Sequence, residues 1–135
     1  GVQTCALPIC EFMDINFSNQ MPIYVQIMNL IKLDIVTKKL RGGDKLLSVR
    51  EMSENLKVNP NTIQRAYQEL EREGITYTQR GMGTFVNADN DMIGRLKNEM
   101  ASETINSFIN GMKSLGFDGK EIINIITKRV KEEGI

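Results

Sequence analysis

One continuous stretch, residues 48–86, constrains the fold more than any other part of the chain. Its sequence is SVREMSENLKVNPNTIQRAYQELEREGITYTQRGMGTFV. Two segments with apolar residues at helical spacing are followed by two short segments rich in β-branched and aromatic residues, with glycines between them. Two helices followed by a glycine-tipped hairpin are the elements of a winged helix-turn-helix. The sequence therefore predicts a mainly α fold with a small β wing, followed by a two-helix C-terminal tail.

Both helices of this stretch carry start signals. Ser48 is a predicted N-cap, and Glu51 three residues later completes a capping box. Asn59 is the predicted N-cap of the second helix, and Pro60 suits its first position because proline has no N–H to lose. Gly74 is expected to end that helix. The predicted buried residues of the first helix are Val49, Met52 and Leu56.

The second helix has one apolar stripe and one polar face. The stripe consists of Ile63, Ala66, Tyr67 and Leu70. The residues expected to face outward are Asn61, Thr62, Gln64, Arg65 and Gln68. Most of these outward side chains are uncharged hydrogen-bond donors and acceptors, which suit the edges of bases in a DNA major groove. This face is therefore the predicted recognition surface.

The glycine turn Arg80-Gly81-Met82-Gly83 is the predicted tip of the wing. A hairpin of this kind is often only a solvent-exposed turn. Because this one follows a helix-turn-helix, its tip is expected beside a minor groove or a phosphate, and Arg80 and Gly81 are the predicted wing contacts.

Several motifs in fixed order resemble the DNA-binding domain of the GntR family of bacterial transcription regulators. They are Leu47–Met52, Leu56–Thr62, Ala66-Tyr67, Leu70-Glu71, Gly74 and Arg80–Val86. The Asn-Pro-Asn-Thr helix start and the short tail are most similar to the YtrA-type subfamily. The resemblance implies that Arg50 grips DNA, and that the protein controls a nearby transporter or cell-envelope stress operon. The full predicted DNA-binding set is Ser48, Arg50, Asn59, Asn61, Thr62, Gln64, Arg65, Arg80 and Gly81.

Two positions depart from the family pattern. Leu47 stands where the family usually has proline, and Lys57 stands where it often has glycine in the turn between the two helices. Glycine is favoured in such a turn because it adopts positive φ without strain at Cβ. Lys57 therefore affects the expected turn geometry but not the expected fold.

Composition argues against catalysis and against a metal site. The chain has no His, and its two cysteines, Cys5 and Cys10, lie in the first ten residues. The usual metal ligands and nucleophile–base pairs are thus missing from the predicted domains, so neither enzymatic activity nor a cofactor is expected. Net charge is zero, with 17 basic and 17 acidic residues, but ten basic and seven acidic residues lie between Lys32 and Arg80. The basic excess is local to the predicted DNA-binding part.

Three segments are predicted: a non-native leader over 1–12, a winged helix-turn-helix DNA-binding domain over 13–88, and a dimerisation tail over 89–135. GVQTCALPI is a poor signal peptide and resembles a translated sequencing adapter, so the native chain is expected to start at Met13. No apolar run is long enough for a membrane span, and a cytoplasmic location is expected. A helix after Pro22 is expected to bury Tyr24, Ile27, Met28, Ile31 and Ile35.

The tail contains two amphipathic segments separated at Gly116, the second capped by Asp118 and Glu121. They carry more large apolar side chains than a lone helical hairpin can cover, so a homodimer through the C-terminal helices is predicted. The predicted dimerisation residues are Leu96, Met100, Ile105, Phe108, Ile109, Met112, Ile122 and Ile126. A chain ending near Asn90 is expected to stay folded.

The favoured function is a DNA-binding transcription regulator that represses by binding a palindromic double-stranded operator as a homodimer. The alternative is a winged-helix protein-interaction module without DNA binding, which the zero net charge permits. Loss of salt-dependent DNA retention would distinguish the alternative, because phosphate contacts make binding strongly dependent on salt. The sequence leaves the existence of a small-molecule effector open.

Overall fold

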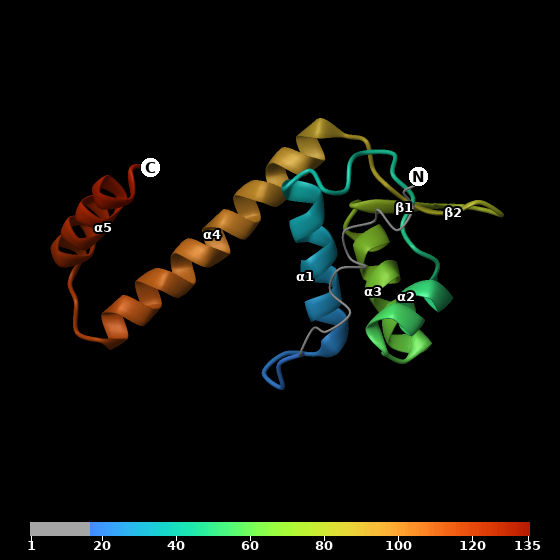
Figure 1. Cartoon of the computed structure of the whole chain (residues 1–135), viewed down its shortest axis with the longest axis horizontal. Helices are drawn as coiled ribbons and strands as arrows, with labels where there is room; N and C mark the ends of the chain where they lie inside the picture. Colours follow the sequence, from blue (N-terminus) through green and yellow to red (C-terminus); the bar gives the residue numbers. More distant parts are fainter. Residues whose placement is uncertain (1–16) are drawn as a thin grey trace. The chain divides into compact units, whose positions relative to one another are not determined.

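The computed structural model describes residues 17–135, so the predicted leader and the predicted start at Met13 lie outside the described residues. The elements follow the order α1 (Ile23–Val36), α2 (Val49–Leu56), α3 (Pro60–Arg72), β1 (Thr76–Gln79), β2 (Gly83–Val86), α4 (Asn90–Ser114) and α5 (Gly119–Glu133) (Figure 1). This order confirms the mainly α fold with a small β wing and a two-helix tail.

The chain forms two compact units, which we call the winged unit, ending at Leu96, and the tail unit, Lys97–Ile135. The boundary falls inside α4 rather than at the predicted residue 88. The first turns of α4 belong to the winged unit, where Met92 and Leu96 are buried. A chain ending near Asn90 would lose both buried side chains, so a cut that spares the winged unit has to follow Leu96.

The core of the winged unit lies where α1 and α2 pack against α3 (Figure 1). The α3 stripe is buried as predicted, and so are all but one of the apolar residues predicted for α1. The exception is Tyr24, which is half-buried. At the other end of the α1–α3 contact, Lys32 Nζ lies 3.0 Å from Glu73 Oε1. The largest fully buried apolar side chains are Ile27, Ile31, Ile35, Leu40, Met52, Ile63, Leu70 and Val86.

Local hydrogen bonds at the helix ends confirm the predicted caps. Ser48 Oγ accepts from the backbone N–H of Glu51 at 3.1 Å, and the Glu51 carboxylate accepts from the backbone N–H of Ser48 at 3.0 Å. Asn59 caps α3, with Pro60 at its start. Lys57 ends α2 with φ 55° and ψ 47°. The turn therefore keeps the left-handed conformation that glycine usually supplies, although a lysine occupies it.

The wing is an antiparallel pair in which Thr76 lies opposite Val86 and Gln79 opposite Gly83. The Tyr77 and Phe85 rings stack across the pair with centroids 5.7 Å apart. Residues 43–46 add a third extended segment, because the backbone N–H of Leu46 donates to the Thr84 carbonyl oxygen at 2.8 Å, and Lys45 bridges to Phe85. The loop before α2 therefore holds the base of the wing in place.

The backbone of Ala88 lies so close to Gly42 that this position in the loop has no room for a side chain. A Cβ added to Gly42 would lie 2.6 Å from the Cα of Ala88, which is backbone and cannot rotate away. Gly42→Ala is therefore expected to lower the free energy of unfolding by about 1–3 kcal/mol, the usual cost of overpacking. Gly94→Ala is the matched control. Gly94 is helical with open space around it, so its substitution should raise stability by about 0.5–1 kcal/mol. Urea unfolding measures both; a neutral Gly42→Ala would show that the loop relaxes freely.

The tail unit comprises the rest of α4, the turn at Gly116, and α5. The predicted capping box of α5 is present, with Asp118 Oδ1 accepting from the backbone N–H of Glu121 at 2.9 Å. Ile122 is the one buried apolar side chain in this unit, all of which the structure describes. Its exposed large apolar residues are Ile105, Phe108, Leu115, Ile123, Ile125, Ile126, Val130 and Ile135. Among the described residues, no helix is long and apolar enough to cross a membrane.

Candidate nucleic-acid interface

The first turns of α3 present polar side chains to solvent. Asn61 and Gln64 are exposed and Thr62 is half-buried, while Ile63 between them is buried. Asn59 Oδ1 accepts from the backbone N–H of Asn61 at 2.8 Å, which fixes the helix tip. The Asn59 side chain therefore has a structural role at the tip, whereas the Asn61 and Gln64 amides point away from the core and can contact a ligand.

Arg65, which is also exposed on α3, contacts α1. Its guanidinium Cζ lies 4.0 Å from the centroid of the Tyr24 ring. The sequence missed this contact, because the helical spacing assigned Tyr24 to the buried stripe of α1. Only the packing of α1 on α3 brings the two residues together.

Ser48 and Arg50 lie at the start of α2. Arg50 Nε lies 3.3 Å from Glu54 Oε1, with both side chains largely exposed. An exposed pair of this kind contributes at most about 1 kcal/mol, so Arg50 can exchange Glu54 for a phosphate at little cost. The Ser48 hydroxyl caps α2 by accepting a hydrogen bond from the backbone N–H of Glu51. Hydrogen bonds from the backbone and the side chain of Ser48 lower the pKa of Glu51, which keeps the capping carboxylate ionised.

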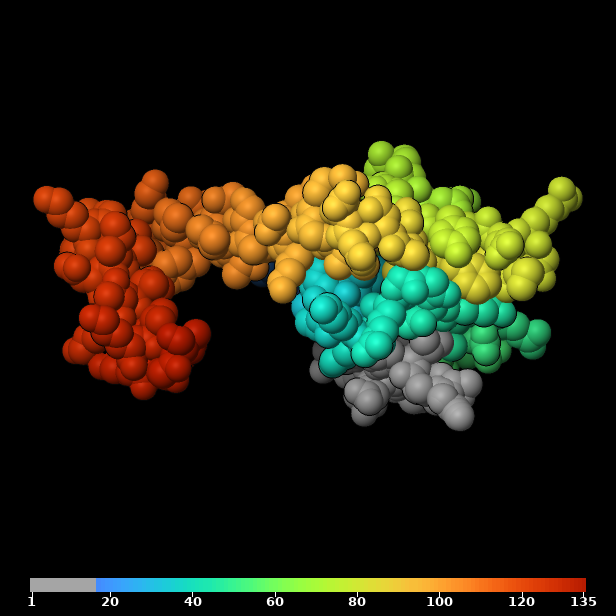
Figure 2. All heavy atoms as spheres, turned by 90° about the horizontal axis from the view of Figure 1, so that it is seen from above, coloured from blue at the N-terminus to red at the C-terminus, as the bar shows by residue number. Residues whose placement is uncertain are grey.

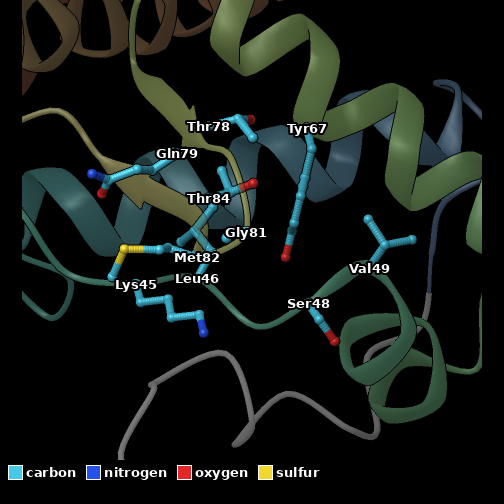
Figure 3. A pocket seen from close by; sticks show the side chains of 11 residues that line it. Lys45, Leu46, Ser48, Val49, Tyr67, Thr78, Gln79, Gly81, Met82 and Thr84 are labelled. Atoms are coloured by element: carbon cyan, nitrogen blue, oxygen red, sulfur yellow. The ribbon is translucent and has the colours of Figure 1, made fainter.

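A hollow of about 420 Å³ lies between the wing and the start of α2 and brings Ser48 and Gly81 together (Figure 3). Tyr67 also lines it; its hydroxyl donates to the Leu47 carbonyl oxygen at 2.6 Å, and burial raises the pKa of this phenol so that it stays protonated. Lys45, from the extended segment before α2, is the cation of this hollow. The lining residues are Lys45, Leu46, Ser48, Val49, Tyr67, Thr78, Gln79, Gly81, Met82, Gly83 and Thr84.

The tip of the wing is an exposed turn in which the backbone N–H of Met82 donates to the Gln79 carbonyl oxygen at 2.9 Å. Arg80 and Gly81 occupy its two central positions and both are exposed. In the space-filling view the hairpin tip extends beyond the rest of the winged unit (Figure 2). The Arg80 guanidinium and the Gly81 backbone are therefore both accessible to a partner molecule.

Acidic residues lie at the far end of α3 and directly after it, and two of them are ion-paired. Glu73 pairs with Lys32, and Glu69 pairs with Arg72 at 2.8 Å. The hydrogen bond from Arg72 lowers the pKa of Glu69, so this carboxylate stays ionised and paired. The negative charge of α3 is thus local to its C-terminal part and distant from the polar tip.

The predicted dimerisation residues fall into two groups. Leu96 is 4% exposed and belongs to the winged unit, and Ile122 is 8% exposed. Both side chains have little surface left to give a partner, because each already packs within the single chain. The others remain accessible in the tail unit; Met100, Ile109 and Met112 are half-exposed, and Ile105, Phe108 and Ile126 are more exposed.

A capped helix with a polar tip, a second helix before it and a hairpin wing after it define a winged helix-turn-helix DNA-binding protein. Residues 23–86 match the family described as "Bacterial regulatory proteins, gntR family". The chain is 46% identical to the uncharacterized HTH-type transcriptional regulator YhcF of Bacillus subtilis over 111 residues, covering 82% of this chain and 92% of YhcF. This protein belongs to the GntR family of transcription regulators.

A second relative supports the YtrA-like subfamily. The HTH-type transcriptional repressor YtrA of Bacillus subtilis is 49% identical over 65 residues, which span 48% of this chain and half of YtrA. A solved GntR family transcriptional regulator from Listeria monocytogenes is similar over 83% of this chain and 98% of its own, with a TM-score of 0.76 and 46% identity. The DNA-binding domain of AraR in complex with operator ORX1 is similar over 53% of this chain and 92% of its own, with a TM-score of 0.50 and 28% identity.

Proposed function

We propose that this regulator is a repressor that binds a palindromic operator as a homodimer, with the winged unit on DNA and the tail unit as the interface between copies. The observation that carries the proposal is the α3 tip, where exposed polar side chains project from a helix fixed by its cap and its buried stripe. Related proteins support the finer assignment: YtrA is a repressor, and the similar AraR domain was solved on an operator. Such a protein would act in the cytoplasm, beside bacterial DNA.

The proposed contacts divide by the part of DNA that each side chain suits. Asn61, Thr62 and Gln64 are assigned to base edges in the major groove, because amides and hydroxyls can both donate and accept. Arg50 and Ser48 at the start of α2 are assigned to phosphates, which position the protein without reading sequence. Arg80 and Gly81 are assigned to the flanking backbone or minor groove.

The exposed apolar residues of the tail unit support the homodimer. Ile105 is 55% exposed and Ile123 is 65% exposed in the single chain. A second copy could cover these side chains with the same surface, which is how twofold interfaces form. Two linked winged units would also turn two weak half-site contacts into one strong site.

Selection of bound sites from a random DNA pool tests the proposed function. The full chain should enrich a palindrome whose half-site centres are about 10 base pairs, or a multiple of that, apart. A single unpaired half-site would overturn the homodimer on DNA. If no sequence is enriched and retention is insensitive to salt, the alternative of a protein-interaction module is favoured.

Arg50→Ala and Arg80→Ala should each weaken operator binding and flatten the slope of log affinity against log salt by roughly one unit per arginine that neutralises a phosphate. Lys131→Ala is the matched control, since it removes one positive charge from an exposed position on α5 that faces away from Ile122 and Ile126. Titrations at several salt concentrations measure the slopes. If Arg80→Ala changes neither the slope nor the preference for A·T pairs at the edge of the site, the wing tip does not contact DNA and is only a solvent-exposed hairpin.

A further inference from the structure

The contact between Tyr24 and Arg65 joins residues 41 positions apart. The Arg65 guanidinium lies over the Tyr24 ring at 4.0 Å from its centroid. Its Nη2 also lies 3.4 Å from the Tyr24 hydroxyl oxygen. A guanidinium within about 6 Å of an aromatic centroid is attracted by the negative face of the ring. The ring therefore restricts a side chain that would otherwise move freely on the surface of α3.

This arrangement leaves most hydrogen-bond donors of Arg65 available. The carboxylate one helical turn further on, Glu69, does not pair with Arg65, because both of its oxygens accept hydrogen bonds from Arg72, at 2.8 and 3.1 Å. Within the described residues, Arg65 makes no ion pair. Stacking uses the face of the guanidinium, whereas its N–H groups point outward in its plane. Arg65 is thus oriented by Tyr24 without being neutralised.

Arg65 also lies on the part of α3 assigned to DNA. It follows Asn61 by four residues, so the two side chains lie on the same face of the helix. Both are exposed. An arginine on this face can donate two hydrogen bonds to O6 and N7 of guanine, the commonest specific contact in the major groove.

We propose that Tyr24 is a positioning residue whose ring holds the Arg65 guanidinium ready to bind the edge of a guanine in each operator half-site. The inference rests on the proposed operator binding and adds one base and one supporting residue to it. Ordering a long side chain during association costs conformational entropy, and a group that is already ordered loses less. Tyr24 would therefore contribute to affinity and base preference through Arg65, without itself touching DNA.

A double-mutant cycle in the full chain tests this on the operator selected from the random pool. Tyr24→Leu removes the ring and should weaken binding about 2- to 30-fold for each Arg65 bound, the range typical of cation–π contacts. It should also reduce the preference for guanine at one position of each half-site. Tyr24→Phe keeps the ring and should stay within about 2-fold of the unaltered protein. In the Arg65→Ala background, Tyr24→Leu should change affinity less than about 2-fold, because the interaction is already absent.

Tyr77→Leu is the matched control, because Tyr77 is a part-exposed tyrosine of the winged unit that stacks on Phe85 instead of an arginine. It should leave the guanine preference unchanged. Equal losses from Tyr24→Leu in both backgrounds would show that Tyr24 only supports the fold or contacts DNA directly. A Tyr24→Phe variant as weak as Tyr24→Leu would overturn the role of the ring.

The identity of the contacted group is tested by Arg65→Ala. If this variant weakens all sequences equally, Arg65 contacts a phosphate and the guanine assignment is wrong. Failure of the proposed function looks different, since the unaltered protein would then enrich no operator at all.

Discussion

Phe108→Asp should convert the full chain from a dimer to a monomer and remove most of its operator affinity. Phe108 is 38% exposed on α4, next to the 55% exposed Ile105. In the proposed interface the ring would be covered by the second copy, whereas an aspartate there would be a buried charge without a partner. Loss of a central aromatic contact commonly costs about 2–4 kcal/mol, which raises the dimer dissociation constant about 30- to 1000-fold.

The effect on DNA should be larger than the loss of one contact. Two linked half-site contacts bind about 10²- to 10⁴-fold more tightly than either alone, and a monomer loses this gain. Sedimentation and operator titration measure the two losses in the same samples. Both should recover in part at high protein concentration, because dimer formation depends on mass action.

Ser107→Asp is the matched control for this substitution. It adds the same charge at the adjacent, exposed position, about 100° around α4 and on the face opposite Ile105, Ile109 and Met112. This variant should remain dimeric. If Phe108→Asp also sediments as a dimer, the apolar face of the tail unit is not the interface, and the winged unit must hold the two copies together.

Asn61→Ala should weaken binding to the selected operator by about 1–3 kcal/mol for each half-site, or roughly 5- to 150-fold. Asn61 is exposed, while its backbone is held by the Asn59 cap. Its amide can therefore reach a base without a change in the helix. Asparagine pairs with N6 and N7 of adenine, so preference for adenine at one position should be relaxed. Thr62→Ala should give a smaller loss within the same range, because Thr62 is half-buried.

Asn98→Ala controls for the loss of an asparagine, since Asn98 is exposed on α4 in the tail unit. Thermal unfolding should give the two α3 variants and the control a free energy of unfolding within about 0.5 kcal/mol of that of the unaltered chain. Unchanged operator affinity in both α3 variants at fixed salt would mean that a different surface faces the groove.

Features set by neighbours three or four residues apart were predictable from the sequence. The capping boxes at Ser48 and Asp118 and the Asn59 cap depend on a side chain and a backbone group within one turn, so residue type and spacing suffice. The buried stripe of α3 follows equally from the helical period. The polar residues of the tip occupy the positions that this stripe leaves exposed, so most of the candidate site could be predicted from the sequence.

Long-range packing decided what the sequence left open. Helical spacing assigned Tyr24 to the core, but the fit of α1 on α3 leaves its ring at the edge, where Arg65 stacks on it. It assigned Leu96 to a partner surface, although the winged unit buries this side chain. Lys45 became part of the site only because residues 43–46 pair with β2. A repeat of apolar residues indicates that one face of a helix is buried, but it does not indicate which other element or which partner chain covers that face. The sequence alone therefore determined the elements and the polar helix tip, and the tertiary structure decided which distant side chains support them.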